Sequence, residues 1–505
     1  MMSYEDPPQS KLFYMGINID KRIRKNHPLR KIRELIDFEF IYNEVRDKYG
    51  YNGNESIPPP VILKLMLLLV LYNVRSEREL MDTLSERLDW LWFLGFDLDT
   101  EIPNHSVLSK ARRRWGEEAF RSFYERVVWQ CTETSSAQVV ESGLVDGRNI
   151  FVDSSLIQAD ASNNSVVDRQ SLKRYLNESY KELEKRLEEE ASEEEVDKGE
   201  DDGSSGGVNK RYISTTDPDA SIMRSGGKAK LRYQTHRAVD GAYEVITATE
   251  VTPGEVNEAH LMVELIESHH RNTEIGAKTV VADSKYGTIE NYLVCWDRGI
   301  RAHIADLKEA QGKGGLRGGI FSDDMFVYDS ETDTYTCPEG KKLKPKSVHM
   351  NRQSMDYAAS RRDCRVCKLR SQCTRNKSGR TVKRHLRQEE INYMRAISKT
   401  TLSKLDIKTR QHLMERSFAR SKRYGFGRAR WRGLWRVRIQ EYLTAAIQNI
   451  QILMKFGIDP RTAVSKLKES MHEKLLRLIA NRERFLWEFI FKLKAAVKVD
   501  FVFSD

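Results

Sequence analysis

The chain has 505 residues, of which 39% are apolar, and its formal net charge is +10 at neutral pH. This length exceeds one ordinary hydrophobic core and indicates about three domains. Residues 181–202 hold twelve acids against four bases, which leaves the remainder of the chain at +18. Such an excess favours a polyanionic partner.

The N-terminus MMSYEDPPQSKLF lacks the pattern of a secretory signal. The most apolar run, Val61 to Leu71, is interrupted by Lys64 and is too short to span a bilayer, so it predicts a core helix. Six cysteines in a chain of this length do not form a disulfide framework. We therefore expect a cytoplasmic protein with reduced thiols and no membrane partner.

Residues 1–28 predict a tail, and residues 29–140 predict an all-helical domain. One helix begins at Pro58 and runs through Leu71, and Ser76 is the predicted N-cap of another that reaches Phe93. Pro103, Asn104 and Ser106 then predict the start of a last helix, whose basic face carries Lys110, Arg113 and Arg114. This pattern is similar to a helix-turn-helix, in which the last helix enters a DNA major groove. The alternative is a helical bundle with a solvated cationic face.

Periodicity changes at RNIFVDSSLIQADAS, which predicts a buried strand with Asp153 in its middle. A carboxylate in an apolar strand is costly unless it is paired or bound to metal. Asp160 is expected at the strand end or in a turn. Residues 162–219 interrupt the strands, and their acidic, glycine- and serine-rich middle predicts a flexible insertion.

Strands resume at KLRYQTHRAVD and YEVITATEVTPG, with Asp240-Gly241 as a hairpin signal. A helix from Asn257 to His269 follows, then a buried strand that ends at Asp283, a helix from Ile289 to Asp297 and a strand at RAHIADL. This is the order of a ribonuclease H-like α/β fold, whose central strands place two carboxylates side by side. We expect that catalytic domain over residues 145–307 and 399–457.

Residues 308–398 predict an insertion domain that holds four of the six cysteines. Cys364 and Cys367 have the spacing of a zinc pair, and Cys337 and Cys373 are the other candidate ligands, with His349 as a substitute. The alternative is a small β-rich insertion in which reduced thiols are packed. Cys131 and Cys295 lie in apolar helices and are expected in the core.

The segment from Gln411 to Met454 combines acidic, basic and aromatic residues. Glu415 and Lys422 are seven residues apart, so on a helix both point the same way. Eight of the nineteen residues from Arg420 to Arg438 are Lys or Arg, with aromatic residues among them, which suits a nucleic-acid backbone with bases to stack on. The predicted DNA contacts of this segment are Lys422, Arg423, Arg428, Arg430, Trp431 and Arg432.

The order and spacing of several motifs resemble the DDE transposases of bacterial insertion sequences, in the branch with a helical N-terminal domain and a cysteine-containing insertion before the final glutamate. The matching motifs are IPNHSVLSKARRRW, VDSSLIQADAS, VVADSKYGTIENYL, CPEGKKL, CRVCKLRSQC, MERSFARSKRYGFGRARWRG and IQEYLTAAIQNI. The resemblance implies that Asp153, Asp283 and Glu415 are the catalytic triad and that Lys422 is the basic residue that follows it. Some related transposases carry tyrosine and arginine where this chain has Lys408 and Gln411.

By this resemblance, the three acids hold two Mg²⁺ or Mn²⁺ ions for strand cleavage and strand transfer at double-stranded DNA, both at the element ends and at the target. A homodimer or higher oligomer associated with the nucleoid is implied as well. His236 and Tyr286 lie near the acids in sequence and are candidate DNA contacts or, alternatively, fold residues. Residues 458–505 lie outside the resemblance and predict a helical tail. Two rival functions are a ribonuclease H-like DNA nuclease without strand transfer and a domesticated DNA-binding protein.

Overall fold

A computed structural model describes residues 2, 18–50, 55–133, 143–168, 206–224, 227, 229–305, 316–317 and 320–456. The acidic middle of the predicted insertion, the first residues of the tail and the predicted C-terminal tail therefore lie outside the described residues. The chain has mixed α/β architecture with a helical N-terminal region, and it divides into two compact units. The first unit contains residues 1–277 and 410–505, and the second contains residues 278–409.

The N-terminal region is built from helices, as predicted. They are α1 (Ile19–Arg22), α2 (Pro28–Leu35), α3 (Ile41–Val45), η2 (Arg46–Lys48), α4 (Pro59–Leu71), α5 (Glu77–Leu84), α6 (Leu88–Leu94), α7 (Ser106–Trp115) and α8 (Glu118–Glu133). Helix α4 is buried almost throughout, which confirms the predicted core helix. The Ser76 side chain accepts a hydrogen bond from Glu79 N, and that of Asn104 accepts one from Ser106 N, so both predicted helix starts are confirmed.

One helix prediction in this region is wrong. The single helix expected from Ser76 to Phe93 is two helices, α5 and α6, separated by a turn at residues 85–87. The Arg87 guanidinium binds both carboxylate oxygens of Asp89, at 2.8 and 2.7 Å, in the first turn of α6. This local pair stabilises a new helix start, which favours two helices over one continuous helix.

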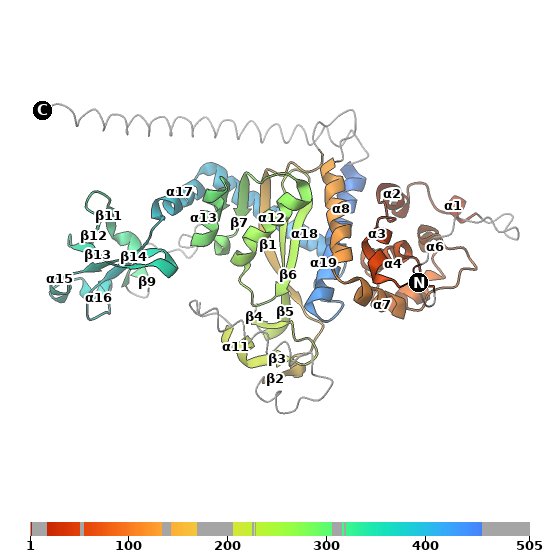
Figure 1. Ribbon diagram of the computed structural model, residues 1–505, viewed down its shortest axis with the longest axis horizontal. Coiled ribbons are helices and arrows are strands. Elements are labelled where there is room, and N and C mark those ends of the chain that lie inside the picture. Colours follow the sequence, from red (N-terminus) through yellow and green to blue (C-terminus); the bar gives the residue numbers. More distant parts are fainter. Residues whose placement is uncertain are drawn as a thin grey trace. The chain divides into compact units, whose positions relative to one another are not determined.

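The centre of the first unit is an antiparallel sheet (Figure 1). Strand β1 (Asn149–Gln158) pairs with β5 (Ala229–Asp240), and β5 also pairs with β6 (Ile246–Pro253) and β4 (Ser221–Arg224). A short pair, β2 (Val166–Asp168) with β3 (Tyr212–Ser214), lies with η3 (Asn163–Ser165) and α11 (Gly206–Arg211). The chain continues into η5 (Glu258–Leu261) and α12 (Met262–Thr273), and α12 packs on β6.

Two long helices return to this unit from the end of the described chain. Helix α18 (Thr401–Arg423) enters it at Arg410, and α19 (Leu434–Phe456) packs against β6 and α8. Figure 1 shows α19 and α8 side by side. The residues of α19 from Val437 to Ile450 are almost all buried, so this helix forms part of the core of the first unit.

The second unit begins with a parallel pair of strands, β7 (Thr279–Ala282) and β8 (Arg301–Ile304). Between them lie η6 (Ser284–Tyr286) and α13 (Ile289–Asp297), as the sequence predicts. Helix α17 (Gln388–Ser398) packs on β8 and α13, and Ser398 Oγ donates to Ala302 O at 3.2 Å. The helix therefore belongs with these strands, although it falls within the predicted insertion.

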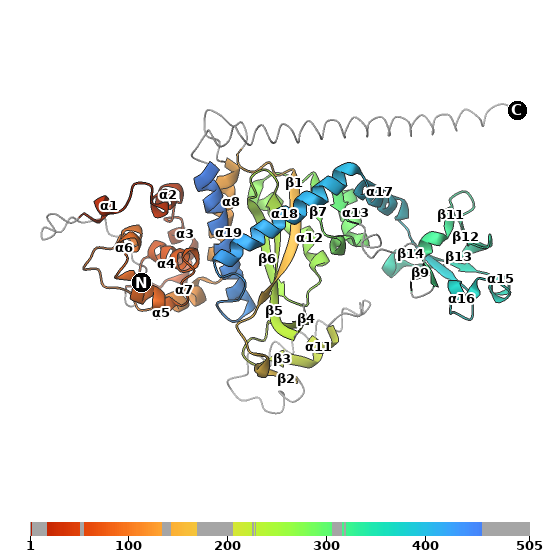
Figure 2. The same cartoon turned by 180° about the vertical axis from the view of Figure 1, so that it is seen from behind.

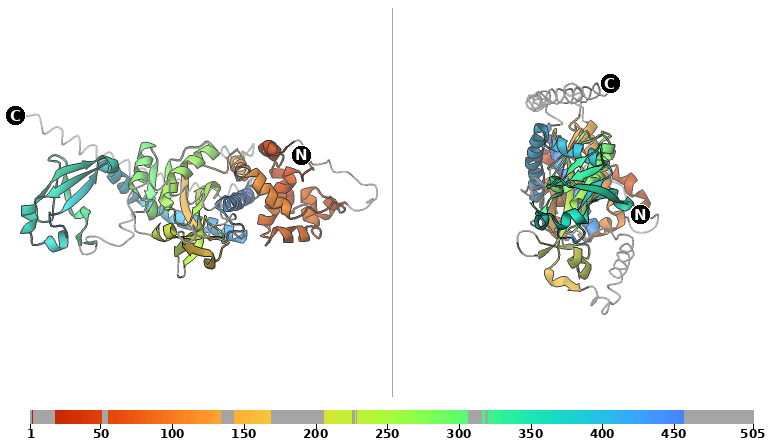
Figure 3. Two further views of the ribbon diagram at one scale, coloured as in Figure 1. Left: turned by 60° about the horizontal axis from the view of Figure 1, so that its bottom comes forward. Right: turned by 90° about the vertical axis from the view of Figure 1, so that its left-hand side faces the viewer.

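The cysteine-containing insertion forms a small antiparallel sheet of its own, drawn in teal in Figure 3. Its strands follow the order β11 (Val327–Asp329), β12 (Thr334–Thr336), β13 (Lys342–His349), β14 (Ser354–Ala359) and β15 (Thr381–His385). The remaining elements are β9 (Leu316–Arg317), β10 (Ile320–Phe321), η7 (Asp323–Met325), η8 (Met350–Arg352), α15 (Arg361–Arg365) and α16 (Arg370–Cys373). The sheet has its own core of Phe326, Tyr335, Leu343, Tyr357 and Val382.

Candidate functional site

Asp153 lies in the middle of β1, between buried apolar residues and the strand end. In the antiparallel register it faces Arg237 of β5, so both side chains leave the same face of the sheet. Asp153 is 23% exposed, and its Oδ2 accepts a hydrogen bond from Arg410 Nη1 at 2.6 Å. Ser154 N donates to Oδ1 at 2.9 Å. The expectation that this carboxylate needs a partner is therefore confirmed, and the partner is a cation from α18.

Helix α18 crosses this face of the sheet (Figure 2). Arg410 and Ser417 are seven residues apart and lie on the same side of the helix. Arg410 contacts Asp153, and Ser417 Oγ accepts a hydrogen bond from Arg237 Nη1 at 3.1 Å. Glu415 is exposed, and Gln411 Nε2 donates to its Oε1 at 3.3 Å. One helix thus contacts both central strands and also carries the predicted final acid.

The Arg237 guanidinium forms a fully buried ion pair with Glu441 of α19. Nε and Nη2 of Arg237 donate to the two carboxylate oxygens at 2.6 and 2.8 Å, and both side chains are 0% exposed. Thr249 Oγ1 of β6 also donates to Glu441, at 2.7 Å. The pair fixes α19 to the sheet on which Asp153 lies. Periodicity did not identify either residue, although a single arginine within the apolar strand YQTHRAVD was a signal.

Asp283 directly follows β7 in the second unit. All four residues of that strand are buried, which confirms the predicted buried strand that ends at an acid. Ser284 Oγ donates to Asp283 Oδ1 at 2.9 Å. Asp153 and Glu415 belong to the first unit, so the convergence of the three acids stays a prediction. Within the described residues, no group of three or more His, Cys, Asp or Glu side chains could hold a metal ion.

The predicted DNA-contacting cations fall into two groups. Lys422 and Arg423 are exposed at the end of α18, and Lys110, Arg113 and Arg114 are exposed on α7. Arg428 and Arg432 are 62% and 54% exposed, and both pair with Asp160. All of these side chains are accessible to a polyanion, since even the paired ones are more than half exposed.

Arg430 and Trp431 are instead docked on the N-terminal helices. Arg430 Nη2 donates to Asn73 Oδ1 at 2.5 Å, and Trp431 Nε1 donates to Glu77 Oε1 at 3.1 Å. The guanidinium carbon of buried Arg112 lies 4.1 Å from the centroid of the Trp431 ring, a cation–π contact. These two residues hold the segment after α18 against the helical region, and a DNA contact of either one stays a prediction.

His236 and Tyr286 are both fully buried, so they are fold residues rather than exposed DNA contacts. His236 Nε2 lies 2.9 Å from Thr252 Oγ1. Burial lowers the pKa of His236 to about 4, so the ring is neutral at physiological pH.

The four candidate zinc ligands lie in the small sheet of the second unit and its two short helices. Cys337 and Cys373 pack against the hydrophobic core of this sheet. Burial raises the pKa of the Cys373 thiol, and the other three thiols raise it further. The described cysteines are free, and no metal-holding group exists within the described residues. Both the packed-thiol arrangement and the zinc site stay predictions. Cys131 and Cys295 are buried, as predicted.

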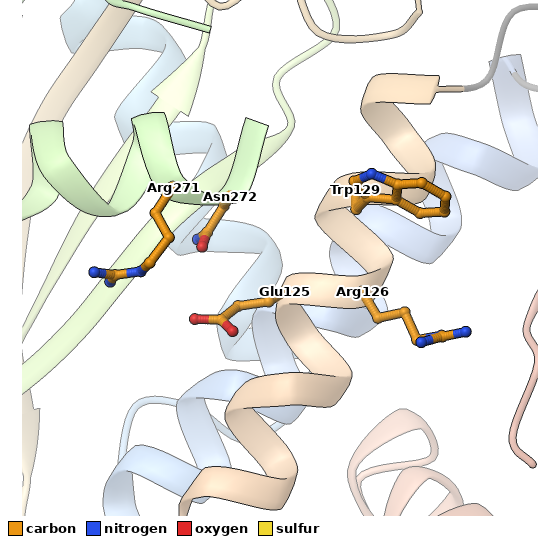
Figure 4. A pocket seen from close by; sticks show the side chains of 5 residues that line it. All are labelled: Glu125, Arg126, Trp129, Arg271 and Asn272. Carbon is orange, nitrogen blue, oxygen red and sulfur yellow. The ribbon is translucent and has the colours of Figure 1, made fainter. Parts of the chain in front are cut away.

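A cavity of about 340 Å³ lies between α8 and α12 in the first unit. Figure 4 shows that Glu125 extends toward α12 whereas Arg126 extends away from it. Trp129, Arg271 and Asn272 complete the lining, and burial raises the pKa of Glu125. None of the predicted site residues lies in this cavity.

Comparison with known families identifies the chain. A family model described as a transposase domain (DUF772) matches residues 17–114, and one described as a transposase DDE domain matches residues 336–454. Together the two matches support a DDE transposase of the insertion-sequence type. The transposase has no match among curated proteins. Among solved structures it is similar to a chain in the synaptic complex of piggyBac transposase with hairpin DNA, at 9% identity. That likeness covers 87% of this transposase and 84% of the other chain, with a TM-score of 0.26, which is too low to define the fold.

The two family models match an N-terminal and a C-terminal part of the described chain. The first covers the N-terminal helices through α7, and the second runs from the small sheet through Glu415 into α19. None of the helices that the structure describes is long and apolar enough to cross a membrane.

Proposed function

We propose that this transposase binds the terminal inverted repeats of an insertion sequence and catalyses metal-dependent strand cleavage followed by strand transfer. The observation that carries the proposal is Asp153, a half-buried carboxylate in the middle of a central strand, with a cationic partner at 2.6 Å. In a transposase of the DDE family, that position suits the first catalytic acid.

A ribonuclease H-like arrangement is consistent with the strands of each unit. In the first unit, β6, β5 and β1 follow one another as antiparallel neighbours, with Asp153 on β1. In the second unit, β7 and β8 are parallel, with Asp283 directly after β7. The predicted fold contains both of these pairings.

Asp153, Asp283 and Glu415 are the residues that would hold Mg²⁺ or Mn²⁺. Carboxylate oxygens are the ligands that these hard cations prefer. The Arg410 guanidinium beside Asp153 indicates that a positive charge is accommodated at this oxygen. Two bound ions would activate the attacking oxygen and relieve charge on the leaving oxygen during an in-line displacement.

The remaining chemistry falls to the cationic side chains of the chain itself. Lys422, two helical turns beyond Glu415 on the exposed surface of α18, would hold a phosphate near the reacting bond, with Arg423 beside it. Water attacks the phosphorus, the bond to the 3′ oxygen breaks, and that oxygen leaves as a 3′-hydroxyl at the element end. The 3′-hydroxyl then attacks a target phosphodiester, so one bond forms as another breaks and no protein–DNA covalent link is needed.

DNA recognition would involve the helical N-terminal region. Exposed Lys110, Arg113 and Arg114 on α7 would contact the repeat, as in a helix-turn-helix docked on a duplex. Two element ends must be processed together, which calls for a homodimer or higher oligomer acting on cytoplasmic, nucleoid DNA.

The test is cleavage and joining by the purified full chain with Mg²⁺ or Mn²⁺. The substrate is a duplex that carries the inverted repeats, taken from DNA flanking the coding region. Replacement of Asp153, Asp283 or Glu415 by Ala should abolish cleavage and leave DNA binding intact. Asp168→Ala is the matched control, because Asp168 is 25% exposed and paired with an arginine, much as Asp153 is. Cleavage that persists in all three triad variants would refute the assignment.

Two further assays separate the rival functions. A duplex with pre-cleaved 3′ ends should be joined to target DNA by this chain, whereas a ribonuclease H-like nuclease would cut DNA but join nothing. A domesticated DNA-binding protein would bind the repeats without either reaction.

A further inference from the structure

The end of β1 and the segment after α18 line an open cavity of about 520 Å³ in the first unit. Gln158, the last residue of β1, pairs with the segment at Arg428: Gln158 N donates to Gly427 O at 3.2 Å, and Ala429 N donates to Gln158 O at 2.8 Å. These backbone hydrogen bonds fix the position of Arg428 against the strand. Backbone hydrogen bonds between β1 and this segment therefore help to shape the cavity, in addition to the surface side chains.

Three cations and one anion line this cavity. Asp160 Oδ1 accepts a hydrogen bond from Arg428 Nη2 at 2.9 Å, and its Oδ2 lies 3.6 Å from Arg432 Nε. Arg432 Nε also donates to the backbone oxygen of Asp160 at 2.9 Å. Lys230, which also lines the cavity, donates from Nζ to Gln158 Oε1 at 3.4 Å. The lining therefore contains the Asp160 carboxylate and three cationic side chains, and its net charge is positive.

The pairs that hold Asp160 are exchangeable. Arg428 and Arg432 are 62% and 54% exposed, and ion pairs this exposed contribute little to stability. A carboxylate and a phosphate present similar oxygen geometry to a guanidinium, so Asp160 holds both arginines at a spacing that also suits a phosphate. An incoming phosphate could take the place of Asp160 without exposing a buried charge.

The lining also indicates which phosphate compound would bind. It contains no aromatic side chain on which a base could stack, since the remaining residues are Ala161, Ser162, Asn163 and Leu231. Small-molecule sites are mostly apolar and nearly enclosed, with aromatic walls. A polar, cationic cavity without a stacking surface suits the sugar–phosphate backbone of a polymer, read without regard to sequence.

We propose that this cavity binds the phosphodiester backbone of duplex DNA and that Asp160 occupies the phosphate position when DNA is absent. This inference rests on the proposed function, since DNA is the ligand in both. Gln158 follows Asp153 by five residues along β1, roughly 16 Å of extended strand, so the cavity holds a stretch of backbone away from the reacting bond. Its role is to position DNA, and Lys230, Arg428 and Arg432 are the positioning residues.

The experiment measures the affinity of the full chain for a fluorescent mixed-sequence duplex as a function of salt, in EDTA so that no cleavage occurs. Arg428→Gln/Arg432→Gln should weaken binding and reduce the slope of log affinity against log salt by about 1.8, which corresponds to two lost phosphate contacts. Lys230→Gln alone should reduce the slope by about 0.9. Asp160→Asn should strengthen binding several-fold, because the competing carboxylate is neutralised.

Matched controls come from Arg211 and Asp168, which form an exposed pair elsewhere in the same unit, 3.0 Å apart. Arg211→Gln and Asp168→Asn should leave affinity and slope unchanged. The inference is overturned if Asp160→Asn weakens binding, or if the double and Lys230 variants keep the wild-type slope. Displacement of the duplex by millimolar inorganic phosphate at constant ionic strength would also overturn it, in favour of a free-phosphate site. Because these readings need no cleavage, such results would leave the proposed catalysis standing, whereas a wild-type chain that binds no duplex would remove both.

Discussion

Two arginine–carboxylate ion pairs on the same face of the central sheet differ in burial and in hydrogen-bond geometry. Asp153 and Arg237 are directly opposed on β1 and β5, and each has a partner of opposite charge on a helix. The Arg237 pair with Glu441 is 0% exposed and bidentate. In the Arg410 pair the two side chains are 12% and 23% exposed, and Arg410 Nη1 donates to Asp153 Oδ2. Burial thus separates a pair that holds the fold from a pair that can be exchanged. The exchangeable one includes the candidate catalytic acid.

The largest loss of stability should come from breaking the buried Arg237–Glu441 pair. Glu441→Gln leaves the Arg237 guanidinium buried without a counter-charge, and loss of one partner of a buried pair typically costs about 3–5 kcal/mol in the free energy of unfolding. Denaturant unfolding of the full chain, followed by circular dichroism, measures this change.

A double variant that removes both charges of the Arg237–Glu441 pair tests the same prediction. Arg237→Met/Glu441→Leu removes both charges together and should recover most of the lost stability, because a well-packed apolar pair is often as stable as a buried ion pair. If Glu441→Gln unfolds like the wild-type chain, the buried pair does not hold α19 to the sheet.

The contrast between the two pairs also explains what the sequence could predict. Strand β1, helix α13 and the start of α7 follow from local periodicity and from the helix starts at Ser106 and Ile289, and all were found where expected. The partner of Asp153 was harder to predict, because Arg410 is 257 residues away along the chain. Arg237 and Glu441 are 204 residues apart and carry no local signal of their contact. Likewise, Arg430 and Trp431 lie in a basic, aromatic pattern that favours DNA, yet tertiary packing places them against Asn73 and Glu77.

The buried histidine His269 should have a smaller effect on the free energy of unfolding, and this effect depends on pH. His269 is 0% exposed; its Nε2 lies 2.9 Å from Gly147 O and its Nδ1 lies 2.8 Å from Thr247 Oγ1. Burial lowers its pKa to about 4, from the usual value of about 6.5. Between these two values the unfolded chain binds more protons than the folded chain, so acidification lowers the free energy of unfolding. The stabilisation is complete above pH 6.5, and up to about 3 kcal/mol is lost by pH 4.

Unfolding of wild type and His269→Gln from pH 7.5 to 4.5 tests this behaviour. The difference between the two chains should change in favour of the variant as the pH falls, since glutamine does not titrate. His270→Gln is the control, because His270 is the next residue on the same helix and is exposed. A difference that stays constant across the pH range would show that His269 is not held neutral by the fold.

The smallest expected effect is on metal binding, and it comes from removing the Arg410 partner of Asp153. Arg410→Gln removes a guanidinium that lies 2.6 Å from Asp153 Oδ2, and a divalent cation that uses this oxygen must compete with that charge. Binding of Mn²⁺ to the full chain without DNA, followed by the electron paramagnetic resonance signal of the free ion, should therefore become about tenfold tighter, equivalent to about 1.4 kcal/mol. Arg416→Gln is the matched control on the same helix, because Arg416 pairs with Glu244 at 2.7 Å and not with a predicted ligand. Weaker Mn²⁺ binding in Arg410→Gln would mean that the arginine orients Asp153 for the metal instead of competing with it. The two ion pairs on this face would then both serve to fix geometry, and their difference in burial would no longer separate fold from function.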